Sequence, residues 1–250
     1  MPKVCFIGTG CATDLVRGPT SLVYQGKSRI LCDCGPSVPE RLVALGYDVN
    51  ALDALYISHA HADHCFGLPT LLLWMRLGGR RRALTLLLPA PLRVALDDLL
   101  ERGYPGSFGS DKCFALERRE LYPEQSQDYA GLGLSIAPTR HRMLNHALRI
   151  DGEGSFAYSG DGVPSASAER LYEGVDCLVH ECAFLVADGA HQGADGLLSL
   201  VARCAPKRVA ALHCDAMLRS SIAAALAADA RVSLPENGEI WAFGAPASDG

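Results

Sequence analysis

Short apolar runs bounded by turn residues dominate the first third of the chain. The stretches "KVCFIG", "TSLVYQG" and "SRILCDCG" each fit a β-strand, and the glycine between the last two predicts a hairpin. The stretch "SVPERLVALGY" groups Leu42, Val43 and Leu45 on one face and ends at Gly46, which predicts a short helix. The same reasoning predicts strands at 52–59 and 84–89 and helices at about 66–77 and 91–103.

The pattern changes along the chain from successive strands to alternating helices and strands. Strands are expected at 113–118, 132–139, 147–150 and 155–160. Helices at 167–174, 193–205 and 218–230 then alternate with strands at 176–181, 207–213 and 239–243. Since no repeat or clear linker interrupts this order, it predicts two sets of strands with helices packed outside. We therefore expect one α/β domain over residues 1–250, with a four-layer αββα sandwich.

Composition excludes several classes of protein. The chain has 250 residues, a net charge of −5 and ten cysteines, but no C-x-x-C pair. A chain of this length needs no disulfide framework, and its acidic balance disfavours non-specific binding of nucleic acid. The longest apolar run, "FGLPTLLLWM", is too short to span a bilayer, and the N-terminal residues lack the apolar core of a signal peptide. We expect a cytoplasmic protein that does not interact with membranes.

Candidate chemistry gathers where the predicted strands end. The segment "SHAHADHCFG" holds three of the eight histidines within six residues. Other strands end in histidine or a carboxylate, and strand ends at one edge of a sheet commonly form a site. Imidazole and carboxylate groups are typical zinc ligands. The candidate metal ligands are His59, His61, Asp63, His64, His141, Asp161 and His213.

The spacing of these residues suits two metal ions. His59 and His61 are two residues apart and can face one ion, whereas Asp63 and His64 lie a turn further on and can face a second. Asp161 is the natural carboxylate to be shared between them. Two ions about 3.5–4 Å apart can hold a bridging water and lower its pKa. Zinc is the expected metal, with manganese or iron as alternatives, because the same donors suit all three.

At these residues the sequence resembles the metallo-β-lactamase-fold hydrolases. The motifs "LCDCG", "HAHADH", "TRH", "YSGD" and "ALHCDA" follow one another in that family's order across nearly the whole chain. The resemblance implies that Asp33 anchors the ligand loop from behind. It also implies that His59, His61 and His141 hold one ion, that Asp63, His64 and His213 hold the other, and that Asp161 bridges the two.

Within that superfamily the chain is most similar to the ribonuclease Z-like phosphodiesterases. The segments "FIGTG", "PTSLVYQGKSRILCDCG" and "YSGDG" are similar to that branch, and "HECAF" resembles its His-Glu-Ala-Thr segment. The resemblance implies that Glu181 orients His191 and that His191 acts as a general acid or contacts the phosphate. A positioned acid contributes about 10²–10⁴-fold to such reactions. Asp63 is a further catalytic candidate, because its free oxygen can accept a proton from the attacking water.

The chain departs from that branch at the substrate-binding arm. Short ribonuclease Z enzymes carry a tRNA-gripping arm between the motifs of His141 and Asp161, whereas here only twenty residues separate them. We therefore expect a small or cyclic phosphodiester substrate rather than tRNA. The alternative is a carbonyl-directed hydrolase, such as a lactonase, thioesterase or β-lactamase-like enzyme, on the same metal site. An iron oxidoreductase is disfavoured, because that branch commonly has glutamate where this chain has His61.

Three further features have simpler interpretations. His146 is expected in the pocket or behind the ligands rather than among them. Arg80, Arg81 and Arg82 follow a predicted helix, whose carboxyl end favours cations, so a solvated helix terminus is the expected interpretation and phosphate steering the alternative. The apolar segment "PTLLLWMRL" is either a homodimer face, as in relatives, or core.

Overall fold

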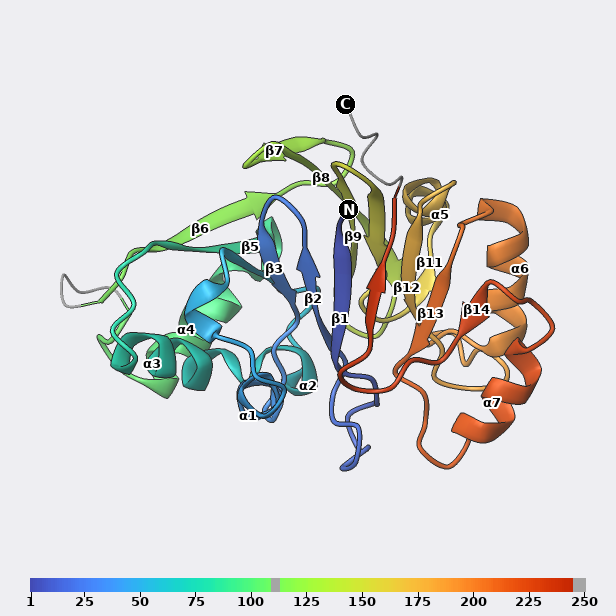
Figure 1. The fold of residues 1–250 in the computed structure, drawn as a ribbon, viewed down its shortest axis with the longest axis horizontal. Coiled ribbons are helices and arrows are strands. Elements are labelled where there is room, and N and C mark those ends of the chain that lie inside the picture. Colours follow the sequence, from blue (N-terminus) through green and yellow to red (C-terminus); the bar gives the residue numbers. More distant parts are fainter. Residues whose placement is uncertain (109–112, 245–250) are drawn as a thin grey trace.

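Two β-sheets pack face to face, and helices cover their outer surfaces in the computed structural model (Figure 1). The structure describes residues 1–108 and 113–244. Large side chains from both sheets, among them Phe6, Tyr24, Phe156 and Tyr158, form the core between the sheets. The predicted four-layer αββα sandwich is confirmed.

The first sheet has seven strands within the described residues, in the order β15-β1-β2-β3-β4-β5-β6. The predicted hairpin is the antiparallel pair β2–β3, whereas β3, β4, β5 and β6 are mutually parallel. Parallel strands end at the same edge, so the residues after β3 and β4 meet there. The strands are β1 (Lys3–Gly8), β2 (Ser21–Gln25), β3 (Arg29–Cys32), β4 (Ala54–Tyr56), β5 (Leu84–Pro89), β6 (Leu116–Leu121) and β15 (Ile240–Ala242).

The second sheet has the order β11-β8-β9-β10-β12-β13-β14, with β7 paired to β8. Strands β10, β12 and β13 are parallel, and β8 runs in the same direction because both β8 and β10 pair antiparallel with β9. The carboxyl ends of these four strands therefore share one edge. The strands are β7 (Gln127–Tyr129), β8 (Leu132–Arg140), β9 (His146–Asp151), β10 (Ser155–Tyr158), β11 (Val163–Pro164), β12 (Cys177–Glu181), β13 (Val209–Leu212) and β14 (Val232–Ser233).

Each sheet has its own helices on its outer face (Figure 1). Apolar residues of α1, α3 and α4 pack on the first sheet, and those of α5, α6 and α7 pack on the second. The helices are α1 (Val38–Ala44), α2 (Ala62–Cys65), α3 (Leu68–Leu77), α4 (Arg93–Gly103), α5 (Ala166–Tyr172), α6 (Ala194–Cys204) and α7 (Arg219–Leu226). None of the helices in the described part is long and apolar enough to cross a membrane.

The helix expected at about 66–77 is α3, and a separate short helix, α2, precedes it. Helix α2 was not predicted, and α3 begins only after Gly67. The Gly67 amide donates to the Cys34 carbonyl, and a Cβ on Gly67 would lie 2.1 Å from the Gly35 carbonyl oxygen. This close backbone contact ties the segment after β4 to the loop after β3, and it separates α2 from α3 at a glycine.

Other boundaries also differ from the predictions. The strand expected at 113–118 runs over β6, the helix expected at 218–230 is the shorter α7, and the strands β7, β11 and β14 were not expected. The solvated-terminus interpretation is wrong for Arg80, which is buried and donates to the carbonyls of Asn50, Arg82 and Ala83. Arg80 satisfies backbone acceptors after α3, whereas Arg81 and Arg82 are exposed.

Candidate active site

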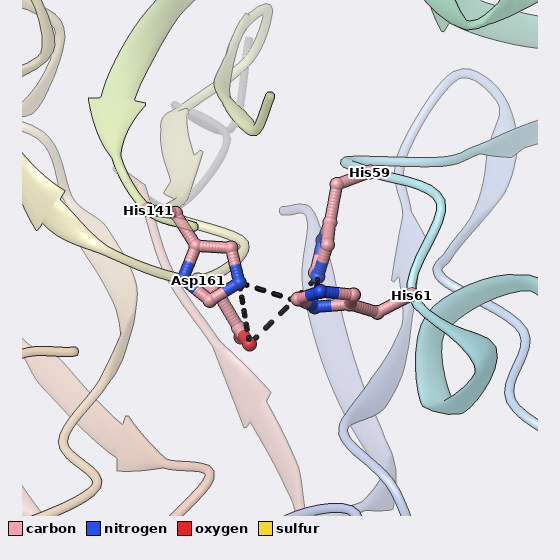
Figure 2. A group of neighbouring side chains, drawn as sticks. All are labelled: His59, His61, His141 and Asp161. Carbon is pink, nitrogen blue, oxygen red and sulfur yellow. Dashed lines mark hydrogen bonds and ion pairs between the residues drawn. The ribbon is translucent and has the colours of Figure 1, made fainter. Parts of the chain in front are cut away.

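The candidate metal-binding residues converge at the shared carboxyl edge of the two sheets. The segment after β4, which includes α2 and is called the ligand loop, supplies four of them, and β8, β10 and β13 are each followed by one of the remaining three. Figure 2 shows the imidazoles of His59, His61 and His141 directed toward one another and toward the Asp161 carboxylate. In this group, and in a second one of Asp63, His64 and His213, the potential ligand atoms lie within 4.8 Å of one another. The structure thus brings together all seven residues predicted from the sequence.

Asp33 anchors the ligand loop from the end of β3. Its Oδ1 accepts from the Ser58 amide at 2.7 Å, and its Oδ2 accepts from Ser58 Oγ, His64 Nδ1 and Tyr158 Oη at 2.6–2.7 Å. The residue is fully buried and has a φ of 59°, which is uncommon for a residue other than glycine. A strained backbone at this position is maintained by three hydrogen bonds from Ser58 and His64 and a fourth from Tyr158 on β10.

Two histidines of the first group present a free ring nitrogen to a third. Ser58 Oγ donates its only proton to Asp33, so it accepts from His59 Nδ1 at 3.0 Å, and His141 Nδ1 donates to the Ala190 carbonyl at 2.8 Å. In both rings the Nε2 atom is therefore left without a proton when the ring is neutral. The two Nε2 atoms lie 2.9 and 3.1 Å from His61 Nδ1.

The second group is oriented in the same manner. His64 Nδ1 donates to Asp33, and its Nε2 lies 3.4 Å from Asp161 Oδ1. Thr20 Oγ1 donates to the Gly10 carbonyl at 2.9 Å and therefore accepts from His213 Nδ1 at 3.2 Å. His213 Nε2 is left facing Asp161 Oδ2 at 3.5 Å. Sequence reasoning missed Thr20, because no motif distinguishes a threonine that follows Pro19 at the start of a strand.

The donor set fits bound metal ions on geometric grounds. His64 Nε2 and Asp161 Oδ1 are buried, face each other, and have no hydrogen-bond partner among the described residues. Buried polar atoms are normally satisfied, and a cation between these two would satisfy both. Burial and the nearby charge of His64 lower the pKa of His59 well below its usual value, so the ring stays in the neutral form that binds metals.

The carboxylates are kept ionised despite their burial. Burial by itself would raise the pKa of Asp161, but the imidazoles of His213 and His64 lower it well below its usual range. Burial likewise opposes ionisation of Asp63, but the adjacent His64 imidazole, whose Nε2 lies 3.3 Å from Asp63 Oδ2, lowers the pKa of Asp63 below its usual range. Both side chains are therefore in the charged form that metal binding requires.

Glu181 and His191 form a hydrogen-bonded pair beside the donor groups. Glu181 Oε2 accepts from His191 Nδ1 at 3.0 Å, and Glu181 Oε1 accepts from the amides of Gly162 and Gln192. Burial raises the pKa of Glu181 to about 7, although the bond from His191 acts in the opposite direction, and the same bond raises the pKa of His191. The loop after β12 thus adds an oriented imidazole to the site.

Other histidines lie outside the donor groups. His146 is buried at the start of β9 and its Nδ1 has no partner among the described residues. His180 packs its ring against Tyr172, with ring centroids 5.5 Å apart, on the side of β12 that faces the helices. Neither belongs to a set of convergent ligand atoms in the described residues.

Two cavities flank the donor groups. The larger, of about 370 Å³, is lined by residues of the β1–β2 loop and by Asp63, Ser37 and Arg41. The smaller, of about 200 Å³, is lined by His191, His213, Phe184 and residues of the same β1–β2 loop. The volume of the larger cavity is in the range of small-molecule sites.

A family model described as Anti-Pycsar protein Apyc1 matches residues 2–227. The chain belongs to the Anti-Pycsar protein Apyc1 family. The Apyc1 protein of Bacillus phage 010DV004 is 28% identical over 229 residues, which cover 84% of this chain and 88% of that protein. The ribonuclease Z of Mycobacterium bovis strain BCG / Pasteur 1173P2 is 30% identical over 209 residues, covering 72% of this chain and 70% of that enzyme.

The comparison with solved structures shows that this member of the Apyc1 family has the metallo-β-lactamase fold. The metallo-β-lactamase fold protein YhfI of Bacillus subtilis superimposes with a TM-score of 0.80 at 19% identity, covering 96% of this chain and 98% of that protein. The resemblance predicted from the motifs is confirmed. With the family and the donor groups together, the chain is a metal-dependent hydrolase of the metallo-β-lactamase fold.

Proposed function

We propose that the chain hydrolyses small, including cyclic, phosphodiesters with two divalent metal ions, most simply zinc. His59, His61 and His141 would hold one ion, Asp63, His64 and His213 the other, and Asp161 would bridge them. When bound, such ions activate a water and neutralise charge on the phosphoryl oxygens. The name of the ribonuclease Z relative supports a phosphodiester bond as the target.

The observation that carries this proposal is the Glu181–His191 pair. A phosphodiester expels an alkoxide, which is a poor leaving group and gains much from a proton donor. Glu181 holds the proton on His191 Nδ1 and orients the ring, and the potential ligand atoms of His191, Asp161 and His213 lie within 4.8 Å of one another. A thioester expels a thiolate, which is stable near neutral pH, so a thioesterase has less need of this pair.

The size of the site supports a small substrate. Between His141 and Asp161 the chain forms only β9, β10 and their turns, so this segment provides no arm to grip a large RNA. The cavity of about 370 Å³ beside Asp63 suits a molecule of mononucleotide size. Asp63 stays ionised as a ligand, and its second role as proton acceptor from the attacking water stays a prediction.

The test is a comparison of substrates with one preparation of protein loaded with zinc or manganese. We expect turnover of bis(p-nitrophenyl) phosphate and of a 3′,5′-cyclic nucleotide. We expect none of a chromogenic cephalosporin or an acyl thioester, and little of a precursor tRNA. Asp161→Ala, confirmed as folded by circular dichroism, should lose all activity. Cleavage of the carbonyl substrates without the diesters would overturn the proposal.

A further inference from the structure

His191 has the surroundings of a metal ligand as well as those of a proton donor. One of its ring nitrogens can be grouped with an Asp161 oxygen and a His213 nitrogen so that all three atoms lie within 4.8 Å of one another. Zinc binds nitrogen and oxygen donors at about 2.0–2.2 Å, so two ligands of one ion lie at most about 4.4 Å apart, and a small movement of the rings is enough to bring these three atoms onto one ion. The ring is nearly parallel to that of His213, with an interplanar angle of 11° and centroids 5.8 Å apart.

The hydrogen bond to Glu181 decides which nitrogen is available. Because the Glu181 carboxylate accepts from Nδ1, the neutral ring has its free lone pair on Nε2. A histidine that donates from one nitrogen to a buried carboxylate and offers the other to an ion is a recurrent arrangement in metal sites, where the carboxylate makes the ring a better ligand. Glu181 is 2% exposed and accepts two backbone amides besides, so its position is fixed.

From this geometry we infer that His191 binds the second metal ion through Nε2 in the resting enzyme and is displaced when a phosphate oxygen of the substrate binds that ion. As a ligand, His191 carries no proton on Nε2 and cannot act as an acid. Once displaced, it takes up a proton from solvent water and stays held beside the substrate by Glu181. The substrate itself thus creates the proton donor. This inference rests on the metal site of the proposed function, but not on the bond that is cleaved.

The test uses the full chain loaded with two equivalents of zinc and labelled with ¹⁵N in its histidine rings. In wild type we expect the His191 Nε2 resonance, assigned by its loss in His191→Asn, at the position of a metal-bound nitrogen. Saturating inorganic phosphate should move it to the position of a free ring. The second zinc equivalent should bind at least about tenfold more weakly to His191→Asn, and more weakly by a smaller factor to Glu181→Gln.

A metal-free melting curve checks that the variants fold, which is expected because the His191 side chain is 22% exposed. The inference is overturned if His191 Nε2 resonates as a free nitrogen in the zinc-loaded enzyme without phosphate, or if His191→Asn binds the second zinc as wild type does. A protein that passes both tests but cleaves no phosphodiester would contradict only the proposed function. If the protein cleaves diesters but the His191 Nε2 resonance is never that of a metal-bound nitrogen, only this inference is contradicted.

Discussion

The loop after β4 and the loop after β12 both deliver imidazoles to the same site, but they hold them differently. In the first, His59 and His64 are fully buried and each donates from Nδ1 into a network centred on Asp33. In the second, His191 is partly exposed and is held by one bond to Glu181. The first arrangement fixes nitrogens where ions bind, whereas the second leaves a ring that can exchange a proton or a ligand.

This difference separates two requirements of the proposed chemistry. Metal binding needs several donors whose orientations are fixed before the ion arrives, and four buried hydrogen bonds to Asp33 achieve this. Proton transfer needs one group that is oriented yet reachable from water, as His191 is. Substitutions in the two loops should therefore produce different defects.

The largest effect is expected from Asp33→Ala. The substitution leaves buried donors of Ser58, His64 and Tyr158 unsatisfied, so we expect a loss of about 4 kcal/mol in the free energy of unfolding together with loss of both metals. Urea denaturation and metal analysis measure the two effects. The control is Asp97→Ala, which removes a partly exposed carboxylate paired with Arg93 and Arg118 and should cost less than about 1 kcal/mol. Equal losses in the two variants would contradict the role of Asp33.

Glu181→Gln should damage catalysis and spare the fold. At saturating metal we expect turnover of a cyclic nucleotide to fall about 100-fold, because the amide no longer stabilises the protonated His191 ring. The free energy of unfolding should change little, since burial already raises the pKa of Glu181 to about 7 and an uncharged amide is easier to bury. Unchanged turnover in the folded, metal-saturated variant would contradict the assignment.

Thr20→Val tests whether a hydroxyl far from the ligand loop in sequence positions a metal ligand. Without Oγ1 the buried Nδ1 proton of His213 loses its acceptor, so we expect the second metal equivalent to bind about 10–100-fold more weakly. Thr20→Ser keeps the hydroxyl and should bind metal normally. Equilibrium dialysis of the metal-free protein against zinc measures the affinities. If both variants bind like wild type, His213 needs no such partner.

The smallest effect concerns histidines that the site does not use. Burial lowers the pKa of His146 to about 4 and that of His180 also to about 4, from an ordinary value of 6.5. Between pH 6.5 and 4 the unfolded chain therefore binds protons that the folded chain does not, so stability is present above pH 6.5 and is lost as the pH falls. The slope is up to about 1.4 kcal/mol per pH unit for each residue.

His146→Gln should reduce the dependence of the free energy of unfolding on pH by up to about 1.4 kcal/mol per pH unit, which is the contribution of one histidine. Urea denaturation of metal-free protein between pH 6.5 and 5 measures the slope without the contribution of bound metal. A variant whose stability falls with pH as steeply as that of wild type would show that His146 titrates normally in the folded state.

Much of the fold and of the candidate site could be predicted from the sequence, because the candidate ligands are close together along the chain or follow recognisable strands. The segment "SHAHADH" and the strand-terminal residues Asp161 and His213 came together as expected. Thr20 and Ala190 could not be predicted, because they orient His213 and His141 through contacts between distant segments. The break between α2 and α3 also depends on such a contact, between Gly67 and Gly35.

The role of His191 as proton donor to a phosphodiester is tested most directly by leaving groups. The measurement is kcat for a cyclic nucleotide and for bis(p-nitrophenyl) phosphate in wild type and His191→Asn, at equal metal content. The alkoxide of the nucleotide needs a proton and p-nitrophenolate does not, so we expect kcat to fall about 10²–10⁴-fold for the nucleotide and less than about tenfold for the aryl ester. An equal fall for both substrates would contradict the role of His191 as the proton donor.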